Sequence, residues 1–530
     1  MATHGSWNLP KKAYMLERTN THHEVSRQDE LSLYAQNIET ALDRRDFSTA
    51  LDLIERDWAC AWFALGPTKM SDLLYQLPRE VLEDRFILRT VQDMLMTNSF
   101  DTVDSSTFLS EVDFSNPRQA HWVTILRAGV YRLVGRSTEA LEQIRLVEQQ
   151  VGQVQSLISS PGGWELHITV QVGVSALLAG ELTQALTSFT RAQMHAPIPK
   201  YAFLTRDSLA KSALIHASFG NTTTAKSLLR RERNIPRTSS WVESHIDAHR
   251  DFAKALLPSS SLDEAYDMLQ AIDLHDIGEL WPFYILAVHR VLEAGGHYDE
   301  LELQLEMFDD MDFPRRDGDG LSGSVIPLKR ALLALRTGRI AEAQEFLDRA
   351  DQNFPYTQLL QAAAHVYAGR TQQAIQDATR LRKDTRGFRL LEIRRLAILA
   401  AAQYQSYEEP DCLETLARAV EVPRGLNIHE VALFSPETRE LAMKKIAGWP
   451  TEYNGPSAFL TGLPRPGLAL TDREVEIIAL LAKGLTRAQM ADKMFISVNT
   501  LKTHLKAIYR KLGVSTAADA VLGAQRRGLI

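Results

Sequence analysis

The chain contains few cysteines and no long apolar run. Its 530 residues include only two cysteines, Cys60 and Cys412, which are far apart and lack the spacing of a metal site. So few cysteines fit a reducing compartment, and we predict that both thiols are packed in the protein interior. No apolar segment approaches the roughly 18 residues that cross a bilayer, and the N-terminus lacks the apolar core of a signal peptide. We therefore expect a cytoplasmic protein without membrane-spanning segments.

Several motifs that mark catalytic and nucleotide-binding sites are also absent. The sequence has no Gly-x-Ser-x-Gly, His-Glu-x-x-His or Cys-x-x-Cys motif, and no Gly-x-x-x-x-Gly-Lys-Ser/Thr phosphate loop. One acidic cluster resembles a metal site, but its spacing is not that of a calcium loop. We interpret it as a solvated, glycine-rich, mobile turn, whose carboxylates are Asp309, Asp310, Asp312, Asp317 and Asp319. The sequence thus predicts no catalytic, cofactor-binding or metal-binding residue.

The charge of the chain is distributed unevenly. Residues 468–530 contain ten Lys/Arg and five Asp/Glu, a net charge of +5, so residues 1–467 carry −12 of the total of −7. Hydrophobic residues make up 45% of the chain, which is ordinary for a globular protein, and the length predicts about two to four domains. A small basic segment on a large acidic body indicates that only the C-terminal segment meets nucleic acid.

From about residue 28 to 448 the apolar periodicity is helical, and an internal repeat is visible. In each copy an apolar helix ends at a glycine, and a small residue five positions later lies in a second helix. Glycine permits the left-handed conformation that ends a helix, and the small residue allows close packing of the pair. The turn positions are Gly135, Gly180, Gly220, Ser260, Gly296, Gly338 and Gly369, separated by 45, 40, 40, 36, 42 and 31 residues. An earlier copy, Asp43–Ala50, lacks the glycine.

This pattern resembles the tetratricopeptide family, although most of its spacings exceed the family's unit of about 34 residues. The resemblance implies a solenoid of helix pairs with a concave surface. The segment Leu53–Glu83 is similar to the start of the helical sensor region of maltose-type activators, in which a nucleotide-binding switch domain precedes the repeats. Aromatic residues in the repeat helices either pack in the core or line a groove for a ligand; they are Trp164, Trp241, Trp281 and Tyr284.

A Pro/Gly-rich segment separates the repeats from the C-terminal residues. Residues 449–467 contain four prolines and three glycines, which break helices and favour a linker. Residues 1–27 are polar and patternless, and we predict a flexible tail there. The predicted parts are therefore a tail at 1–27, a helical-repeat sensor domain at 28–448, a linker at 449–467 and a DNA-binding domain at 468–530.

The last part shows the signals of four short helices. Thr471 with Glu474, and Thr486 with Gln489, have the spacing of capping boxes, and Ser497 is the expected N-cap of a third helix. That helix runs from Val498 to about Leu512. Its predicted core residues are Leu501, Leu505, Ile508 and Leu512, and a fourth helix is predicted to pack through Ala518, Val521 and Leu522. The opposite face of the third helix carries Asn499, Lys502, Thr503, Lys506 and Arg510, a set that can enter the major groove of DNA.

The whole C-terminal segment resembles the LuxR-type DNA-binding domain. Three motifs stand in order: Leu470-Thr-x-Arg-Glu474, Ile496-Ser-x-x-Thr-x-Lys-x-His504 and Lys511-Leu-x-Val514. The resemblance implies that Lys502, Thr503 and Lys506 meet base edges and nearby phosphates. It also implies backbone contacts by Thr500, His504 and Arg487, and dimerisation through Val521 and Leu522. For His504, hydrogen bonding to a local carboxylate or carbonyl stays open as the alternative.

This segment departs from the family pattern at three places, and these put the operator sequence in doubt. They are the run Arg487–Ala491, Thr503 where an aliphatic residue is usual, and Ala517 where an arginine is common.

These features predict an all-α protein, in which a tetratricopeptide-like helical solenoid is followed by a four-helix LuxR-type helix-turn-helix domain. We expect a transcription regulator whose repeats sense an unknown small molecule, peptide or protein. Its C-terminal domain would bind double-stranded operator DNA as a homodimer. The alternatives are a scaffold or signalling-complex subunit with weak or no DNA binding, a subunit that needs a separate nucleotide-switch protein, and an enzyme with an unrecognised site.

Overall fold

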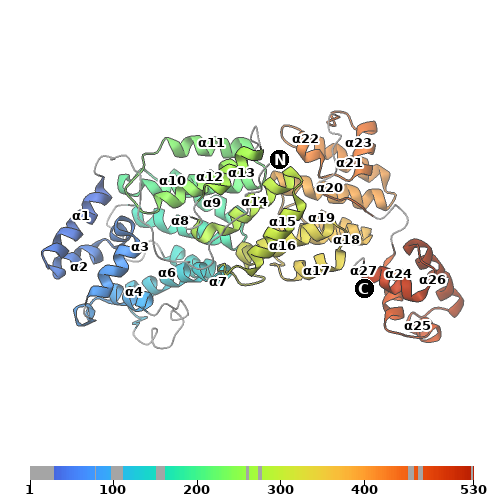
Figure 1. Ribbon diagram of the computed structural model, residues 1–530, viewed down its shortest axis with the longest axis horizontal. Coiled ribbons are helices and arrows are strands. Elements are labelled where there is room, and N and C mark those ends of the chain that lie inside the picture. The colour runs from blue at the N-terminus through green and yellow to red at the C-terminus, as the bar shows by residue number, and fades with distance from the viewer. Residues whose placement is uncertain are drawn as a thin grey trace, which may run out of the picture. The chain divides into compact units, whose positions relative to one another are not determined.

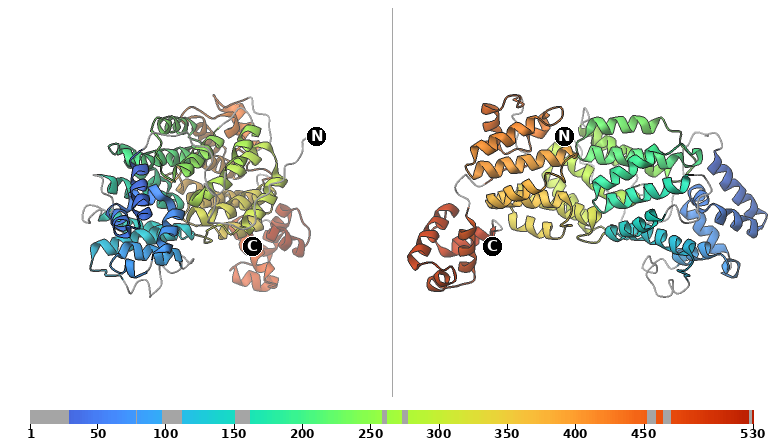
Figure 2. Two further views of the ribbon diagram at one scale, coloured as in Figure 1. Left: turned by 60° about the vertical axis from the view of Figure 1, so that its left-hand side comes forward. Right: turned by 180° about the vertical axis from the view of Figure 1, so that it is seen from behind.

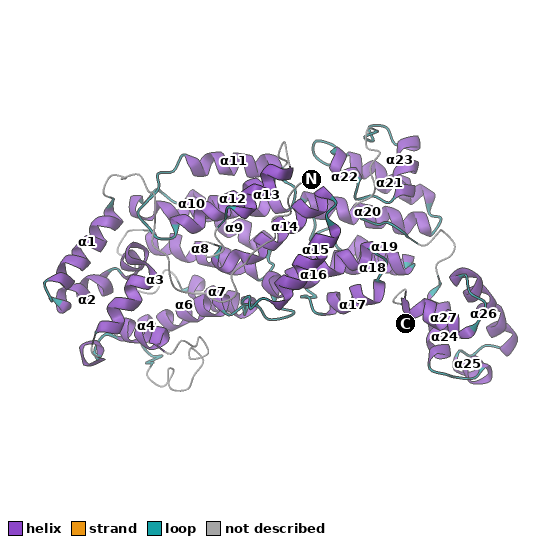
Figure 3. Ribbon diagram, in the orientation of Figure 1, coloured by secondary structure: helices purple, strands orange, loops and turns teal. Residues whose placement is uncertain are grey.

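The computed structural model of the protein contains only helices, turns and loops among the residues that it describes (Figure 1; Figure 3). The described residues are 29–77, 79–96, 112–150, 162–257, 262–272, 277–451, 459–463, 470–526 and 529–530. None of the helices in these ranges is both long and apolar enough to cross a membrane. The predicted all-α fold is therefore confirmed.

The described residues fall into two units, one formed by residues up to 215 with 223–284, the other by 216–222 with 285–530. The helices up to residue 280 are α1 (Glu30–Asp43), α2 (Phe47–Arg56), α3 (Trp58–Gln76), η1 (Arg79–Leu82), α4 (Phe86–Met96), α6 (Pro117–Leu133), α7 (Ser137–Gln149), α8 (Gly163–Leu178), α9 (Leu182–Met194), η3 (Pro199–Tyr201), α10 (Ala202–Ser218), α11 (Thr222–Arg233), α12 (Glu243–Ala255), α13 (Leu262–Gln270) and η5 (Gly278–Leu280). The helices after residue 280 are α14 (Trp281–Gly295), α15 (Tyr298–Asp310), α16 (Gly320–Arg336), α17 (Ile340–Asp348), α18 (Pro355–Ala368), α19 (Thr371–Arg380), α20 (Arg389–Gln405), α21 (Glu409–Val420), α22 (Ile428–Val431), α23 (Pro436–Lys445), α24 (Asp472–Ala482), α25 (Arg487–Lys493), α26 (Val498–Leu512) and α27 (Ala517–Arg526).

Consecutive helices pack in pairs, and the pairs stack on one another. Within the first unit α6 packs on α7 and α8 on α9; within the second, α16 packs on α17, α18 on α19 and α20 on α21. The second helix of one pair also packs on the first helix of the next, as α7 does on α8 and α19 on α20. The pairs of the second unit lie side by side in the right-hand view of Figure 2. Each repeat thus completes its core only with its neighbours, as in a solenoid.

The turn glycines have the conformation that the repeat pattern predicts. All six, at 135, 180, 220, 296, 338 and 369, have φ between 73° and 84°. This left-handed region is open to glycine without a steric penalty. The residues five positions later are buried in every copy; they are Ala140, Ala185, Ala225, Leu301, Ala343 and Ala374. The repeat is therefore confirmed at these positions, while Ser260 lies outside the described residues.

Two further repeats use a residue other than glycine at the turn. In the first copy Arg45 has φ 57°, and Ala50 is buried five positions later. Between α20 and α21, Tyr407 has φ 61°, and Cys412 fills the small-residue position. The sequence pattern does not reveal this last repeat, because a tyrosine stands at the position where the other copies have glycine. A left-handed residue other than glycine costs roughly 1–2 kcal/mol, which the packing of the repeat must offset.

Close packing inside the pairs also explains one glycine within a helix. Gly173 lies in α8 opposite Phe189 of α9, and a Cβ atom at Gly173 would sit 2.6 Å from Cε1 of the ring. The two helices approach because no side chain separates them. Trp164, Trp281 and Tyr284 are buried, and the half-buried Trp241 donates its indole N–H to the Trp62 carbonyl at 3.1 Å. These aromatic residues therefore belong to the core.

The acidic cluster is only partly the solvated turn that the sequence indicates, because Asp310, Asp312 and Asp317 are exposed but Asp309 is half-buried. Asp309 accepts hydrogen bonds from Arg315 at 2.9 Å, Arg330 at 2.7 Å and Arg349 at 3.3 Å. Burial alone would raise the pKa of Asp309, but the arginines lower it below its ordinary value. The described residues contain no group of His, Cys, Asp and Glu that could hold a metal ion.

Of the glycines beside this cluster, Gly318 lies exposed in a turn, whereas Gly320 and Gly323 are buried in α16. They have the spacing Gly318-x-Gly320-x-x-Gly323, but a turn precedes them and not the strand that a dinucleotide motif requires. Gly323 lies in α16, where a Cβ atom would sit 2.0 Å from the Arg316 carbonyl oxygen. The start of α16 therefore needs glycine to let two backbones approach, and the mobility of the preceding turn stays a prediction.

Both cysteines are buried free thiols, as predicted. Burial raises the pKa of each thiol to about 12, so neither is reactive at neutral pH.

Parts of the Pro/Gly segment are also packed. Trp449 contacts Phe434 edge to face at 5.1 Å, and Phe459 and Leu460 are buried. The domain boundaries given above remain predictions, but residues 459–461 do not behave as a freely solvated linker.

Buried histidines make the first unit sensitive to acid. Burial lowers the pKa of His167 and of His249 to about 4. In the folded protein these histidines stay neutral, because their pKa lies below the unfolded value of about 6.5. The free energy of unfolding is therefore highest above pH 6.5 and falls as the pH is lowered toward 4. When the pH is lowered from 7 to 5, we expect each of the two histidines to lower the free energy of unfolding by on the order of 2 kcal/mol.

The measurement is denaturant unfolding of the wild type and His167→Phe at both pH values. Phenylalanine fits the aromatic surroundings of His167, which contacts Phe63 and Trp164, and it does not titrate. The variant should lose less stability than the wild type on acidification. Equal losses in the two proteins would contradict the assignment.

Candidate nucleic-acid interface

The C-terminal helices begin at the caps that the sequence predicts. The Thr471 hydroxyl accepts from the Glu474 N–H at 3.3 Å, and the Glu474 carboxylate accepts from the Thr471 N–H at 2.8 Å. Thr486 and Gln489 form the second capping box in the same way. Ser497 caps α26 by accepting from the Thr500 N–H at 3.0 Å, and Gly513 ends it with φ 71°. Local sequence therefore sets the ends of these helices.

The core of this domain is largely the predicted one. Its buried residues include Ile477, Ile478, Leu501, Leu505, Ile508 and Leu512. The prediction for the fourth helix is wrong, however. Ala520 and Ala524 are the buried residues of α27, whereas Ala518 is exposed, Val521 is half-buried and Leu522 is 46% exposed. Thr516 caps this helix by accepting from the Asp519 N–H at 3.1 Å.

Two polar contacts fix α26 against the first helix. The Lys511 ammonium forms a largely buried ion pair with Glu474 at 2.7 Å, which joins the end of α26 to the start of α24. The Arg473 guanidinium donates to the carbonyl oxygen of Met494, just before the turn that leads into α26. Phe495 makes this turn with φ 52° and is 95% exposed. The orientation of α26 thus depends on contacts at both of its ends.

One face of α26 is basic and fully accessible. Lys502, Lys506 and Arg510 are exposed and lie four residues apart, so they share one side of the helix. Asn499 and Thr503 are exposed on the same side, and the Thr503 hydroxyl donates to the Asn499 carbonyl at 3.2 Å. The sequence of α26 contains no Asp or Glu. Within the described residues, none of its three outward cations forms an ion pair, in contrast to Lys511.

The other predicted contact residues flank this face. Thr500 is exposed, and its hydroxyl lies 2.8 Å from that of Ser497. His504 is half-buried on the next stripe of α26, and Arg487 is the exposed first residue of α25. The structure therefore gathers Asn499, Lys502, Thr503, Lys506 and Arg510 on one surface. Thr500, His504 and Arg487 lie beside it.

A short helix, a tight turn and a longer helix with an unpaired basic face define a helix-turn-helix DNA-binding domain. In agreement, residues 468–524 match the family described as "Bacterial regulatory proteins, luxR family". The C-terminal part of the chain is thus a LuxR-type helix-turn-helix domain, as the sequence motifs indicate.

Three transcription regulators share this similarity. The chain is 40% identical over 65 residues to the transcriptional regulatory protein LiaR of Bacillus subtilis (strain 168) and 55% identical over 53 residues to the probable transcriptional regulatory protein SgaR of Hyphomicrobium methylovorum. It is 40% identical over 57 residues to the HTH-type transcriptional regulator MalT of Yersinia enterocolitica serotype O:8 / biotype 1B (strain NCTC 13174 / 8081). These matches cover 12%, 10% and 11% of this chain, and 31%, 25% and 6% of the three relatives.

The buried carboxylate of Glu474 is expected to stabilise this domain. Glu474→Gln keeps the size of the side chain but leaves Lys511 without a counter-charge and weakens the capping box. We expect a loss of about 1–3 kcal/mol in local stability. Hydrogen exchange of the amides in α24 and α26 measures it in the full-length chain.

The matched control is Glu476→Gln, which removes an exposed carboxylate that pairs with Arg473 at 2.8 Å. Exposed ion pairs contribute about 0–1 kcal/mol, so exchange should change little. If both variants exchange alike, the Glu474–Lys511 pair does not hold the two helices together.

Proposed function

We propose that the protein is a cytoplasmic transcription regulator that places α26 in the major groove of operator DNA. The unpaired basic face of α26 is the single observation that carries this proposal. Unpaired cations attract phosphate through counterion release, and polar side chains between them can meet base edges. The similarity of residues 468–524 to the luxR family supports the same role.

Within this proposal the contact residues have different tasks. Lys502, Thr503 and Lys506 occupy the middle of the exposed face and would meet base edges and nearby phosphates. Asn499 and Arg510 extend the face toward the two ends of α26. Thr500, His504 and Arg487 flank it and would contact the DNA backbone. Because His504 is half-buried, a structural hydrogen bond stays the alternative for that residue.

We propose further that the repeats sense an effector and that a separate segment transmits its presence to the DNA-binding domain. Stacked helix pairs present a continuous inner surface suited to a ligand. An effector changes DNA binding only if its affinity differs between two states of the protein. The buried residues Phe459 and Leu460 lie between the repeats and residue 468 in the chain. A conformational change in the repeats would reach the DNA-binding domain through the packing of these two residues.

The test of DNA binding compares full-length wild type with Lys502→Ala/Lys506→Ala in capture of genomic fragments at a fixed salt concentration. The wild type should enrich one motif, and the double variant should lose this enrichment. On the enriched sequence, the slope of log affinity against log salt should fall by about two, one for each lysine removed.

The charge-matched control is Lys444→Ala/Lys445→Ala, which removes two exposed lysines from α23 in the repeat region. It should capture DNA as the wild type does. Capture by neither wild type nor control, with or without cell extract, would favour the scaffold alternative. Capture that requires an ATP-binding protein from the extract would favour a subunit that works with a nucleotide switch.

We also propose that the protein binds DNA as a homodimer through α27. Leu522 is 46% exposed on this helix although it is apolar, and Val521 beside it is half-buried. Leu522→Glu should shift the DNA-bound protein from dimer to monomer in sedimentation velocity. Met443→Glu, at another exposed apolar position, is the control and should leave the dimer intact. A dimer that survives Leu522→Glu would remove α27 from the interface.

A further inference from the structure

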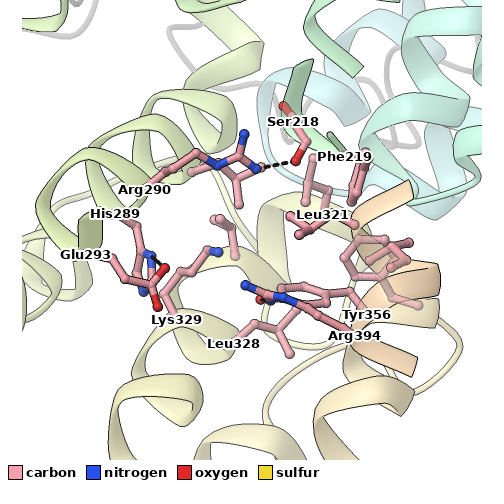
Figure 4. A pocket seen from close by; sticks show the side chains of 15 residues that line it. Ser218, Phe219, His289, Arg290, Glu293, Leu321, Leu328, Lys329, Tyr356 and Arg394 are labelled. Carbon is pink, nitrogen blue, oxygen red and sulfur yellow. Dashed lines mark hydrogen bonds and ion pairs between the residues drawn. The ribbon is translucent and has the colours of Figure 1, made fainter. Parts of the chain in front are cut away.

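A cavity in the second unit gathers one polar group from each of four consecutive first helices of the repeats. Arg290 comes from α14, Lys329 from α16, Tyr356 from α18 and Arg394 from α20. The cavity volume is about 50 Å³, and Ser218 and Phe219 line one side. Figure 4 shows the ends of Arg290, Lys329 and Arg394 directed into the same space.

The cations in this cavity outnumber the carboxylates. Lys329 and Arg394 are each only 7% exposed, and Arg290 is half-buried. The one acidic side chain of the lining is Glu293, which lies 3.6 Å from Nδ1 of His289. Burial, followed by the neighbouring Lys329 and Arg394, lowers the pKa of His289 well below 6.5, so this histidine is neutral. Three cations and one carboxylate give the lining a formal charge of +2, and burial lowers the pKa of Lys329 and of Arg290.

Among the described residues, no carboxylate forms an ion pair with Lys329 or Arg394. Arg394 donates to the Tyr356 hydroxyl, but its buried Nε has no hydrogen-bond partner within the described part of the chain. The Lys329 ammonium lies 5.3 Å from the centre of the Tyr356 ring and forms no ion pair with a described carboxylate. Arg290 donates to the carbonyl oxygens of Ala217 and Ser218. Buried cations without counter-charges are costly, and a bound anion would relieve that cost.

The other buried cations among the described residues are neutralised by carboxylates of the protein. Arg206 in the first unit is buried between the carboxylates of Glu232 and Glu243. In the second unit, Arg395 pairs with Glu392 at 2.6 Å. The absence of such pairs for Lys329 and Arg394 is therefore particular to the cavity. If these cations had only a structural role, we would expect carboxylates of the same chain beside them.

The rest of the cavity wall is apolar. Its side chains are Phe219, Leu286, Leu321, Val325, Leu328, Phe354, Leu390 and Leu391. We propose that this cavity binds a small organic anion of charge about −2, such as a dicarboxylate or a phosphate monoester. The oxyanion groups would contact Lys329 and Arg394, and the carbon skeleton would contact the apolar wall. This inference rests on the proposed sensor role of the repeats and names the chemical class of their effector.

The same arginine touches the segment that leads to the DNA-binding domain. The Arg394 guanidinium lies 5.7 Å from the centre of the Phe459 ring, and the Thr461 N–H donates to the Tyr367 hydroxyl at 3.2 Å. An anion on Arg394 weakens the attraction between this guanidinium and the aromatic ring. Occupancy of the cavity thus acts directly on the packing of Phe459.

The experiment is isothermal titration calorimetry of the full-length protein, without DNA and in phosphate-free buffer. The probes are succinate, glycerol 3-phosphate and inorganic phosphate, with glycerol as the uncharged control. We expect succinate or glycerol 3-phosphate to bind, and which one binds distinguishes carboxylate from phosphate. Heat from none of the three anions, or binding by inorganic phosphate alone, would overturn the proposal of an organic anion.

Two variants test the site itself. Lys329→Met should weaken binding at least tenfold, and Lys329→Arg should restore most of it. Without an anion, Lys329→Met should also unfold at the same or a higher temperature, because it removes one of several like charges. A lysine with a purely structural role would lower that temperature. Val325→Phe, which narrows the cavity and keeps its charge, should abolish binding even if Lys329→Met does not fold.

Binding that persists unchanged in Lys329→Met and in Val325→Phe would place the anion elsewhere and overturn the assignment. The result is separable from the DNA-binding role because the titration contains no DNA. If genomic capture succeeds and no organic anion binds, only this inference fails. If an organic anion binds this cavity and capture fails, the site stands and the proposed function falls.

Discussion

The fold depends on one packing constraint: in each repeat, a left-handed turn must be followed, five residues later, by a side chain that fits between two helices. The buried alanines at 140, 185, 225, 343 and 374 meet it, and Cys412 meets it in the repeat whose turn is Tyr407. Gly173 opposite Phe189 shows how little space remains between paired helices. Within the second unit the first helices of successive pairs also pack on one another, as α16 does on α18 and α18 on α20.

Burial of charge follows from this packing. Side chains between packed helices are desolvated, so a cation there needs a partner from a neighbouring repeat. Arg206 forms ion pairs with two carboxylates, and Asp309 accepts hydrogen bonds from three arginines. Lys329 and Arg394 instead contact Tyr356 and line the cavity. That contrast separates the cavity from the rest of the core, and it makes the cavity a place where a small charge added from outside has a large effect.

In the described part of the C-terminal domain the largely buried cation is paired and the unpaired cations are exposed. Lys511 is paired with the capping carboxylate of Glu474, so the position of α26 is fixed by a largely buried contact. Lys502, Lys506 and Arg510 point outward on a helix that has no acidic residue. A rigid support for an unpaired basic face is what a sequence-reading helix needs, since misplacement of the helix would cost its base contacts. The acidic body, with its charge of −12, leaves this face as the favoured surface for DNA.

Features that depend on a few neighbouring residues could be predicted from the amino-acid sequence alone. Turn glycines, capping boxes and the exposed face of α26 are local, so spacing alone located them, and the resemblance to the LuxR family agreed. Tertiary structure decided the rest. It set the buried side of α27, the left-handed turn at Tyr407 and the arginine partners of Asp309. Only stacking brings Arg290, Lys329 and Arg394 to one cavity, because they lie in separate repeats and no spacing within one helix relates them.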